Sequence, residues 1–461
     1  MVFNSAAFLF LFLPVCFLLH RLLPGRRTRA VLLGALSLVF YAFGGLAQVP
    51  VLALCAVWNF VFGRLLERET GPRKLWRTMA VCGDLGLLGV YKYADFLLGT
   101  LGYGAPWGEL TAPLGISFFT FHAVSYIVDV YRRPALAEKR FDALFLYLAF
   151  FPRLLAGPIL SWRQAQSEPF GRAVSAEETA AALRRFIRGL AKKLLLAESA
   201  AAVANGVFAL DLPALSSSLA WLGGVSYCLQ IYFDFSGYSD MAIALGALFG
   251  FTFPENFAHP YAARTLSDFW RRWHMSLNRW FVDYVYIPLG GSRRGLAVTV
   301  RNTLIVFFFT GLWHGAGWTF ILWGLWHGLF VSLERLGKKP LAALERTGLG
   351  RAGLHIYTLL VVLVGFVMFR AATVTQGLVI LGRMILPRSA DLAGAMAMKT
   401  ILTPARCAFL VMGSVFSLPV SEKLRPRIPE WAGDLLSLAL LVLCIGAMAL
   451  GGFTPFIYQQ F

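Results

Sequence analysis

The chain has 461 residues, of which 58% are hydrophobic, 15% are aromatic and only 14% are charged. This composition leaves too little polar surface for a water-soluble protein, and it predicts a polytopic membrane protein. The formal charge of +18 raises the possibility of nucleic-acid binding, but the 42 Lys and Arg residues lie in short clusters between apolar runs. Such clusters are typical of cytoplasmic loops, so we expect no nucleic-acid partner.

The first apolar run, Met1 to Leu19, has no basic region ahead of it and no small-residue cleavage site behind it. We therefore expect it to remain in the protein as the first membrane span. Four arginines follow this run within ten residues: Arg21, Arg26, Arg27 and Arg29. The positive-inside rule places them in the cytoplasm and the N-terminus on the outer side.

A hairpin is predicted next, with apolar arms at residues 30–46 and 51–62. Residues 103–113 carry Gly, Pro and Glu but no Lys or Arg, which indicates an outer loop, and the run 114–130 returns to the cytoplasm. Later apolar runs raise the expected total to about 11 to 13 membrane segments. No stretch is long or polar enough for a separate soluble domain, so we expect one integral-membrane domain over residues 1–461.

The apolar run 142–160 breaks the simple pattern, because Pro152, Gly157 and Pro158 interrupt it and both of its flanks are basic. Irregular backbone at membrane depth is tolerated only where protein or water covers it. We therefore predict a re-entrant segment; a kinked span is the alternative, and it would invert the downstream topology.

Residues 181–193 alternate apolar and basic side chains in a helical pattern, which predicts a basic amphipathic helix on the membrane surface. The apolar face is Leu183, Phe186, Ile187 and Leu190, and the basic face is Arg184, Arg185, Arg188, Lys192 and Lys193. Anchoring to lipid is one use of such a helix, and holding a phosphorylated donor is another.

Asp234 and Asp240 lie in a run of aromatic, small and hydroxyl residues that spans residues 232–240. A carboxylate in such surroundings needs hydrogen-bond partners. The two aspartates either pin helices together or line a polar path for a substrate. His259, in a His-Pro step that indicates a loop, is interpreted as structural or interfacial.

The segment from Ser267 onward reads as a helix, with Ser267 as a possible N-cap. Trp270, Trp273, Leu277 and Trp280 recur at helical spacing. His274 follows Trp270 by four residues and so shares this aromatic face, while Arg271 and Arg272 can reach headgroups or donor phosphates. The pattern predicts an interfacial helix that brings a histidine to the membrane.

His314 lies in the run Leu312-Trp313-His314-Gly315-Ala316-Gly317-Trp318, between two apolar arms. Glycine allows close approach of backbone and ligand, so we predict a glycine-flanked hairpin with His314 at its turn. His327 lies 13 residues further on, or about 20 Å along a helix. It cannot readily share the His314 site unless the segment bends.

The residue pattern excludes several chemistries. The chain has no His-x-x-x-His set, the six cysteines show no CxxC spacing, and no Gly-x-Ser-x-Gly or dinucleotide fingerprint occurs. We therefore expect no metal, no disulfide and no bound cofactor. A histidine with a near-neutral pKa suits a general base that takes a proton from a hydroxyl acceptor.

Several motifs in this order resemble the membrane-bound O-acyltransferase family, in particular its bacterial alginate O-acetyltransferase branch. The motifs with the strongest likeness are residues 271–277, 286–291 and 312–316, and the likeness extends to residues 1–5, 126–131, 150–159, 189–193, 230–240 and 455–458. This resemblance implies a bundle of membrane helices with a hollowed core, in which acyl groups from a cytoplasmic thioester reach an acceptor across the bilayer.

The resemblance also implies roles for individual residues. The family's near-invariant histidine matches His314 and its second polar position matches His274, so both are predicted catalytic residues. Arg271 and Arg272 are predicted to hold donor phosphates, Asp234 to keep the passage polar, and Trp313 to line the donor site.

The implied function is O-acetylation of an exopolysaccharide such as alginate. The donor is expected to be acetyl-CoA or another acyl thioester, and the location is the bacterial inner membrane with the N-terminus in the periplasm. Expected partners are periplasmic or SGNH-type acetyltransferases, the polysaccharide and membrane lipid. The alternatives are transfer of D-alanine or acetyl groups to cell-wall polymers, and a polysaccharide or ion transporter without enzymatic activity.

Overall fold

A computed structural model of the chain describes residues 1–68, 70–103, 111–424, 429–451 and 456–457. Over these residues the regular structure is helical and contains no strand, which confirms the predicted all-α class. The chain forms two compact units, the first from residues 1–187 and 238–255 and the second from residues 188–237 and 256–457. The single domain expected over residues 1–461 stays a prediction.

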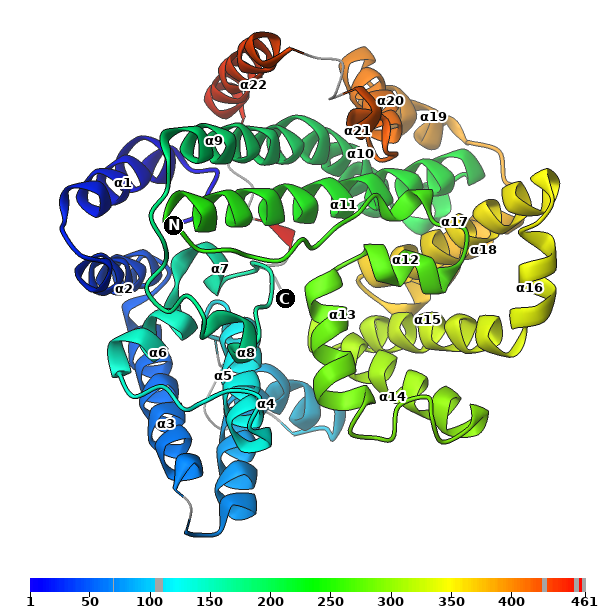
Figure 1. Ribbon diagram of the computed structural model, residues 1–461. Helices are drawn as coiled ribbons and strands as arrows, with labels where there is room; N and C mark the ends of the chain where they lie inside the picture. Colours follow the sequence, from blue (N-terminus) through cyan, green and yellow to red (C-terminus); the bar gives the residue numbers. More distant parts are fainter. Residues whose placement is uncertain (69, 104–110, 425–428, 452–455, 458–461) are drawn as a thin grey trace. The chain divides into compact units, whose positions relative to one another are not determined.

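The first unit contains the helices coloured blue to cyan in Figure 1, most of the green helix α9 and the last part of α11 (Ser217–Leu248). Apart from the last part of α11, they are a π-helix at Phe8–Phe12, α1 (Leu13–Leu22), α2 (Arg26–Ala42), a 3-10 turn at Leu46–Gln48, α3 (Val49–Glu67), α4 (Arg73–Thr100), α5 (Ile116–Arg132), α6 (Phe141–Ala149), α7 (Phe151–Leu154), α8 (Trp162–Ala165) and most of α9 (Ala176–Ala191). Helices α2 and α3 confirm the predicted hairpin, whereas most of the predicted outer loop 103–113 lies outside the described residues.

The region around Pro152 and Gly157 is broken, as these residues predict. The chain leaves the helical path at Phe150, forms only one turn in α7, and then runs without regular structure to α8. Nearly all of this irregular stretch is buried, and Ser37 of α2 accepts a hydrogen bond from the backbone N–H of Phe151 at 3.1 Å. Protein therefore covers the irregular backbone, as membrane depth would require; the re-entrant orientation itself stays a prediction.

The second unit contains the later helices and the first part of α11. They are a π-helix at Lys192–Ala197, α10 (Glu198–Phe208), a 3-10 turn at Leu212–Ala214, α11 (Ser217–Leu248), a 3-10 turn at Pro260–Ala262, α12 (Leu266–Arg272), α13 (Met275–Phe281), a π-helix at Val282–Tyr286, α14 (Leu296–His314), α15 (Trp318–Leu336), α16 (Lys338–Leu344), α17 (Gly348–Arg370), α18 (Val374–Ile385), α19 (Leu392–Ile401), α20 (Pro404–Phe416), α21 (Val420–Leu424) and α22 (Glu430–Leu450).

The amphipathic pattern predicted over residues 181–193 holds only in part. Phe186 and Leu190 are buried as expected, but Leu183 is 44% exposed and the side chain of Lys193 is only 4% exposed. The wider turn of the π-helix that begins at Lys192 changes the side-chain register there. The prediction that Lys193 belongs to the exposed basic face is therefore wrong.

Among the residues that the structure describes, four helices are long and apolar enough to cross a membrane: Leu46–Glu67 (the 3-10 turn with α3), α14, α17 and α22. The bent pair α19 and α20, which turn by 72° at their junction, could form a fifth span. The other segments among the 11 to 13 expected are too short, too broken, too polar or too charged to count as spans. Phe8–Leu22 is one of the shorter apolar helices.

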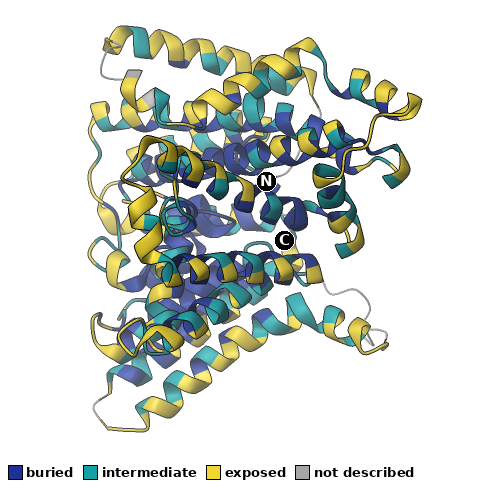
Figure 2. Cartoon of the chain, turned by 90° about the vertical axis from the view of Figure 1, so that its right-hand side faces the viewer, coloured by how far each residue is buried: buried dark blue, intermediate teal, exposed yellow. Residues whose placement is uncertain are grey.

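The surface of the described residues is rich in apolar side chains. The exposed positions, yellow in Figure 2, include many large hydrophobic residues, and Leu54, Leu438 and Val442 are each more than half exposed. A soluble protein buries such stretches, whereas a membrane helix turns them toward lipid. The chain is accordingly a multi-pass membrane protein.

Candidate active site

The hairpin predicted around His314 is present. His314 is the last residue of α14, and three small residues connect it to α15. The two helices approach closely where Gly311 and Gly324 meet, since a Cβ on either glycine would overlap a backbone carbonyl oxygen of the other helix. Close packing through small residues is how membrane helices associate tightly. The glycines thus fix the position of the histidine at the end of the hairpin.

Aromatic rings enclose His314. Its ring centroid lies 4.8 Å from that of Trp313, 5.0 Å from that of Trp323 and 5.2 Å from that of Phe369. The residue is only 3% exposed. Aromatic walls exclude bulk water. In such a setting, hydrogen bonds and other electrostatic interactions are stronger than in solution.

The segment that carries His274 differs from its prediction. Instead of one continuous helix, α12 ends at Arg272 and α13 begins at Met275. His274 has φ 44° and ψ 51°, a left-handed conformation that is unusual for a residue with a Cβ. Such strain persists only where the surrounding structure imposes it, and it concentrates at functional sites.

The loop at residues 256–258 imposes this break. The backbone N–H of Ala258 donates to the carbonyl of Arg272, and the backbone N–H of Met275 donates to the carbonyl of Asn256, both at 3.0 Å. These bonds satisfy backbone groups that would otherwise pair within a continuous helix. The long-range partners therefore stabilise the interruption at His274.

The hydrogen bonds around Asn256 define the tautomer of His274. The side-chain oxygen of Asn256 lies 3.2 Å from Nδ1 of His274 and accepts hydrogen bonds from the backbone N–H of Ser276 at 3.2 Å and its hydroxyl at 2.9 Å. The backbone N–H of Ser276 can only donate, so the Asn256 side-chain atom that it contacts must be the amide oxygen. Because this oxygen can only accept, Nδ1 of His274 carries the hydrogen. The lone pair of the neutral ring is then on Nε2.

Burial lowers the pKa of His274 to about 3, so its imidazole is neutral at physiological pH. The residue is 2% exposed and lies in the break between α12 and α13, outside the four candidate spans. A neutral imidazole held in one tautomer can accept a proton or a hydrogen bond at a fixed position.

Trp313 connects the two predicted catalytic histidines. Its ring centroid lies 6.0 Å from that of His274 and 4.8 Å from that of His314. The ring of His274 also contacts that of Phe235 of α11, with 4.6 Å between their centroids. The structure therefore brings His274, Trp313 and His314 together within the second unit, and we call these three residues the histidine site.

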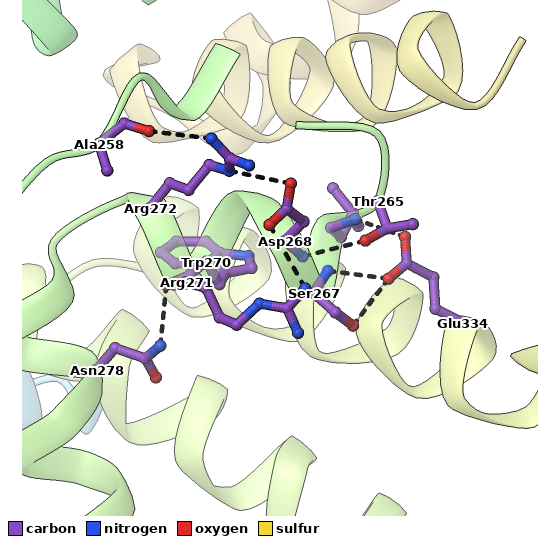
Figure 3. A network of polar contacts seen from close by, with 10 residues as sticks. Ala258, Thr265, Ser267, Asp268, Trp270, Arg271, Arg272, Asn278 and Glu334 are labelled. Carbon is purple, nitrogen blue, oxygen red and sulfur yellow. Dashed lines mark hydrogen bonds and ion pairs between the residues drawn. The ribbon is translucent and has the colours of Figure 1, made fainter. Parts of the chain in front are cut away.

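The start of α12 is held by a residue that sequence reasoning did not identify. Glu334 of α15 accepts hydrogen bonds from the backbone N–H of Leu266 at 2.5 Å and from the backbone N–H and hydroxyl of Ser267 at 2.9 Å each (Figure 3). The N-cap is Thr265, whose hydroxyl accepts from the N–H of Asp268, so the expectation that Ser267 is the cap is wrong. A carboxylate at a helix N-terminus is favoured by the helix dipole. Glu334 thereby ties the His274 segment to the helix that follows His314.

Figure 3 also shows how the two predicted phosphate-binding arginines lie. Arg272 donates from Nε to Asp268 at 3.0 Å and from Nη1 to the carbonyl of Ala258 at 3.4 Å. Arg271 makes a longer contact of 3.4 Å to Asp268, and its side chain is 69% exposed. Of the two, Arg271 has the guanidinium that is more accessible to a ligand.

Asp234 belongs to a buried ion cluster, which we define as Lys193, Glu198 and Asp234. The ammonium of Lys193 lies 2.6 Å from Asp234 and 2.7 Å from Glu198. The second carboxylate oxygen of Asp234 accepts from the backbone N–H of Ile457 at 2.9 Å. Asp234 thus has protein partners, an arrangement that favours its structural interpretation over a role in lining a substrate path. Asp240 belongs to the first unit, where it pairs with Arg185 at 2.8 Å.

The remaining sequence candidates lie outside the histidine site. His327 is buried on α15, and the ring of Trp323 contacts both His327, at 5.3 Å, and His314. His259 has a φ of 47° and lies 3.2 Å from the exposed carboxylate of Glu422. Trp323 is therefore a common neighbour of His327 and His314, and His259 is paired with a surface residue.

Comparison with known proteins identifies the family. Residues 110–349 match the model of the membrane-bound O-acyltransferase family, and this range contains every predicted site residue. The chain is 40% identical to a probable alginate O-acetylase of Pseudomonas putida over 385 residues, which cover 80% of this chain and 77% of the relative. It is 41% identical to a probable alginate O-acetylase of Azotobacter vinelandii over 382 residues, which cover 80% of this chain and 75% of the relative.

A peptidoglycan O-acetyltransferase of Helicobacter pylori is 35% identical over 376 residues, which cover 73% of this chain and 70% of the relative. The relatives therefore share the enzyme class and differ in the polymer that they modify. This chain belongs to the membrane-bound O-acyltransferase family.

Proposed function

We propose that this O-acyltransferase moves acetyl groups from a cytoplasmic thioester, such as acetyl-CoA, across the bacterial inner membrane for O-acetylation of an exopolysaccharide such as alginate. The observation that carries the proposal is the histidine site, in which two buried histidines both contact one tryptophan. The names of two similar relatives, both probable alginate O-acetylases, support the acetyl group and the class of acceptor. Family membership sets aside the transporter alternative.

His314 acts as the general base in this proposal. Its imidazole takes the proton from an acceptor hydroxyl while the hydroxyl oxygen attacks the thioester carbonyl. The new C–O bond forms, the C–S bond breaks, and the imidazolium returns the proton to the leaving thiolate. The alternative in which His314 carries the acyl group transiently uses the same nitrogen as a nucleophile.

His274 orients the donor or the acceptor hydroxyl. Its Nδ1–H is held by Asn256, so Nε2 is the nitrogen that can accept a hydrogen bond from a substrate hydroxyl. Trp313 contacts both imidazoles and provides a flat apolar surface for the acyl group. The aromatic enclosure also keeps water from competing for the thioester.

Arg271 and Arg272 hold the phosphates of the donor through charge-assisted hydrogen bonds. The greater exposure of Arg271 assigns it the larger share of this contact. The substrate-binding role expected for Asp234 stays a prediction, and its contacts with Lys193 and Ile457 favour an anchoring role instead.

The acceptor is modified outside the cytoplasm in this proposal, with the N-terminus in the periplasm. Periplasmic or SGNH-type acetyltransferases pass the acetyl group from this protein to the polymer. The resemblance to a peptidoglycan O-acetyltransferase makes peptidoglycan the second candidate acceptor.

The experiment measures O-acetyl groups on the host's exopolysaccharide, by infrared ester absorption or NMR. A deletion strain is complemented with the wild type, His314→Ala or His274→Ala at matched membrane levels. We expect deletion and His314→Ala to abolish acetylation and His274→Ala to reduce it strongly. His259→Gln is the matched control. In the described part of the chain, the ion-pair partner of His259 is the exposed carboxylate of Glu422.

Unchanged exopolysaccharide acetylation in the deletion strain would contradict the proposed acceptor. Peptidoglycan from the same cells is then assayed for ester, and its loss would assign the second candidate. Full acetylation with His314→Ala would contradict the assignment of the base, whichever polymer is modified.

A further inference from the structure

The second unit contains an open groove that the proposed reaction does not use. It lies between α16 and the first turns of α17, which follow α15 in the chain (Figure 1). Its volume is about 520 Å³, within the roughly 300–1,000 Å³ of typical small-molecule sites. Among the described residues, the lining contains no charged side chain, and its apolar walls are formed by Leu341, Leu344, Leu349, Leu354 and Tyr357.

Two glycines shape the groove. A Cβ at Gly350 would overlap the carbonyl oxygen of Leu344, so this glycine allows the end of α16 to approach α17 closely. Thr347 fixes the connection, because its hydroxyl accepts a hydrogen bond from the backbone N–H of Gly350 at 3.0 Å. A Cβ at Gly353 would meet no atom within 4 Å. Gly353 thus leaves open the space that a side chain would occupy.

The apolar side chains at the edge of the groove are exposed. Leu349 is 88% exposed and Leu344 is 49% exposed. They lie where α17, one of the candidate membrane spans, begins at Gly348. Such exposure is unfavourable in water, but hydrocarbon covers it at the end of a membrane helix. The groove therefore lies where acyl chains meet the headgroup region.

Basic residues border the groove. Residues 335–351 include five basic side chains and a single acidic one. Lys338 lies one turn before Leu341 on the same face of α16. Lys338, Lys339 and Arg346 are exposed, and the described residues provide none of them with an ion-pair or side-chain hydrogen-bond partner. Three cations are thus available to an external anion beside an apolar groove.

This combination selects an amphiphile with a hydrocarbon chain and an anionic head. A soluble anion would use the cations and leave the groove empty, and a zwitterionic lipid carries a positive charge that the cations repel. Anionic phospholipids of the bilayer provide both the chain and the negative charge, and basic clusters beside a membrane helix attract them. The N-terminus of α17 adds to this attraction, because its first turn contains no acidic residue.

We propose that the groove between α16 and α17 is a binding site for one anionic glycerophospholipid. An acyl chain of the lipid lies along the leucines and Tyr357, and its phosphate contacts Lys338, Lys339 and Arg346. The assignment does not rest on the acetyl-transfer reaction.

The test is photo-cross-linking of the full-length protein in phosphatidylcholine nanodiscs that contain a trace of a photoreactive lipid. The probe is phosphatidylglycerol or phosphatidylcholine with a diazirine on one acyl chain, and mass spectrometry quantifies the lipid adducts on residues 341–357. We expect at least fivefold more adduct with the phosphatidylglycerol probe at equal probe concentration.

Two variants separate the contributions of the lipid head and the lipid chain. The triple variant Lys338→Gln, Lys339→Gln and Arg346→Gln should lower phosphatidylglycerol labelling to the phosphatidylcholine level. Gly353→Phe fills the groove, leaves the three cations in place and should lower labelling at least fivefold. The space around Gly353 accepts a side chain without overlap, so this variant should fold normally.

The matched control removes three exposed cations of the first unit by Arg26→Gln, Arg68→Gln and Lys74→Gln, and it should leave labelling unchanged. Equal labelling by the two probes would indicate bulk lipid and would overturn the proposal. Unchanged labelling of Gly353→Phe, or an equal loss in the control and the triple variant, would overturn it as well. If the triple variant does not fold, Gly353→Phe and the comparison of the two probes decide the outcome.

Discussion

The histidine site and the buried ion cluster are two polar regions in the same unit, and they satisfy their polar groups in opposite ways. In the ion cluster, Lys193 is surrounded by two carboxylates, and a backbone N–H completes the coordination of Asp234. In the histidine site, the imidazoles of His274 and His314 contact aromatic rings. Because Nδ1 of His274 donates to Asn256, Nε2 is the nitrogen that can accept a hydrogen bond.

This difference separates a stabilising region from a reactive one. Opposite charges that neutralise each other hold helices together but have little capacity left for chemistry. Neutral imidazoles in an apolar enclosure can accept a proton when a substrate hydroxyl arrives. Substitutions in the ion cluster should therefore change stability first, and substitutions in the histidine site should change activity first.

The largest effect on stability is expected for Lys193→Met. This change leaves Asp234 and Glu198 without their shared cation, and an uncompensated buried charge costs about 3–5 kcal/mol. Thermal unfolding of the purified protein measures the loss. Lys193→Met combined with Asp234→Leu should be more stable than Lys193→Met alone, and equal stability of the two proteins would contradict the account of the cluster.

A smaller loss is expected for Gly324→Ala in the hairpin that positions His314. The new Cβ would overlap the carbonyl oxygen of Phe307, and overpacking of this kind costs about 1–3 kcal/mol. Gly317→Ala is the matched control, since the nearest atom to its Cβ would be 3.5 Å away and its backbone is extended. The unfolding temperatures of the two variants provide the comparison; a control as unstable as Gly324→Ala would count against the packing argument.

The pH dependence of stability tests whether His274 is buried and neutral. Its pKa is about 3 in the folded protein against an ordinary value of 6.5, so the unfolded chain binds the proton first as the pH falls. The contribution of His274 is complete above pH 6.5 and is lost progressively toward pH 3. His274→Gln should therefore lose less stability than the wild type between pH 7 and pH 5, which thermal melts at both pH values measure. Parallel losses would indicate a solvated imidazole.

The smallest effect on stability is expected for Arg271→Ala. An exposed ion pair contributes about 0–1 kcal/mol, so the unfolding temperature should change little. Loss of a phosphate contact should instead raise the KM for the thioester donor several-fold with kcat nearly unchanged. Steady-state kinetics separate the two parameters, and an unchanged KM would remove Arg271 from the donor site.

The parts of the fold that sequence predicts are those set by local patterns. The His314 hairpin follows from glycines and tryptophans adjacent in the chain, and the break near Pro152 follows from residues that cannot continue a helix. The α2–α3 hairpin was predictable for the same reason, because a short turn separates two apolar runs.

Long-range contacts set the parts that sequence does not predict. The helix breaks at His274 because residues 256–258 supply backbone partners, and no local signal marks that loop as a partner. Glu334 is distant in sequence from the helix start that it holds, and it resembles an ordinary solvent-facing residue near the end of α15. Lys193 shares a basic cluster with exposed residues, and only the π-helix and the carboxylates of Asp234 and Glu198 distinguish it.

The central claim is that His314 performs the chemistry of acyl transfer. Its most direct test is the rate of thiol release from acetyl-CoA by the purified protein in nanodiscs, with its periplasmic acetyltransferase partner and non-acetylated exopolysaccharide present. His314→Ala is compared with the wild type and with His259→Gln. The account predicts that His314→Ala lowers the rate by about 10²–10⁴-fold with unfolding temperature preserved, whereas a rate within threefold of the wild type would contradict it.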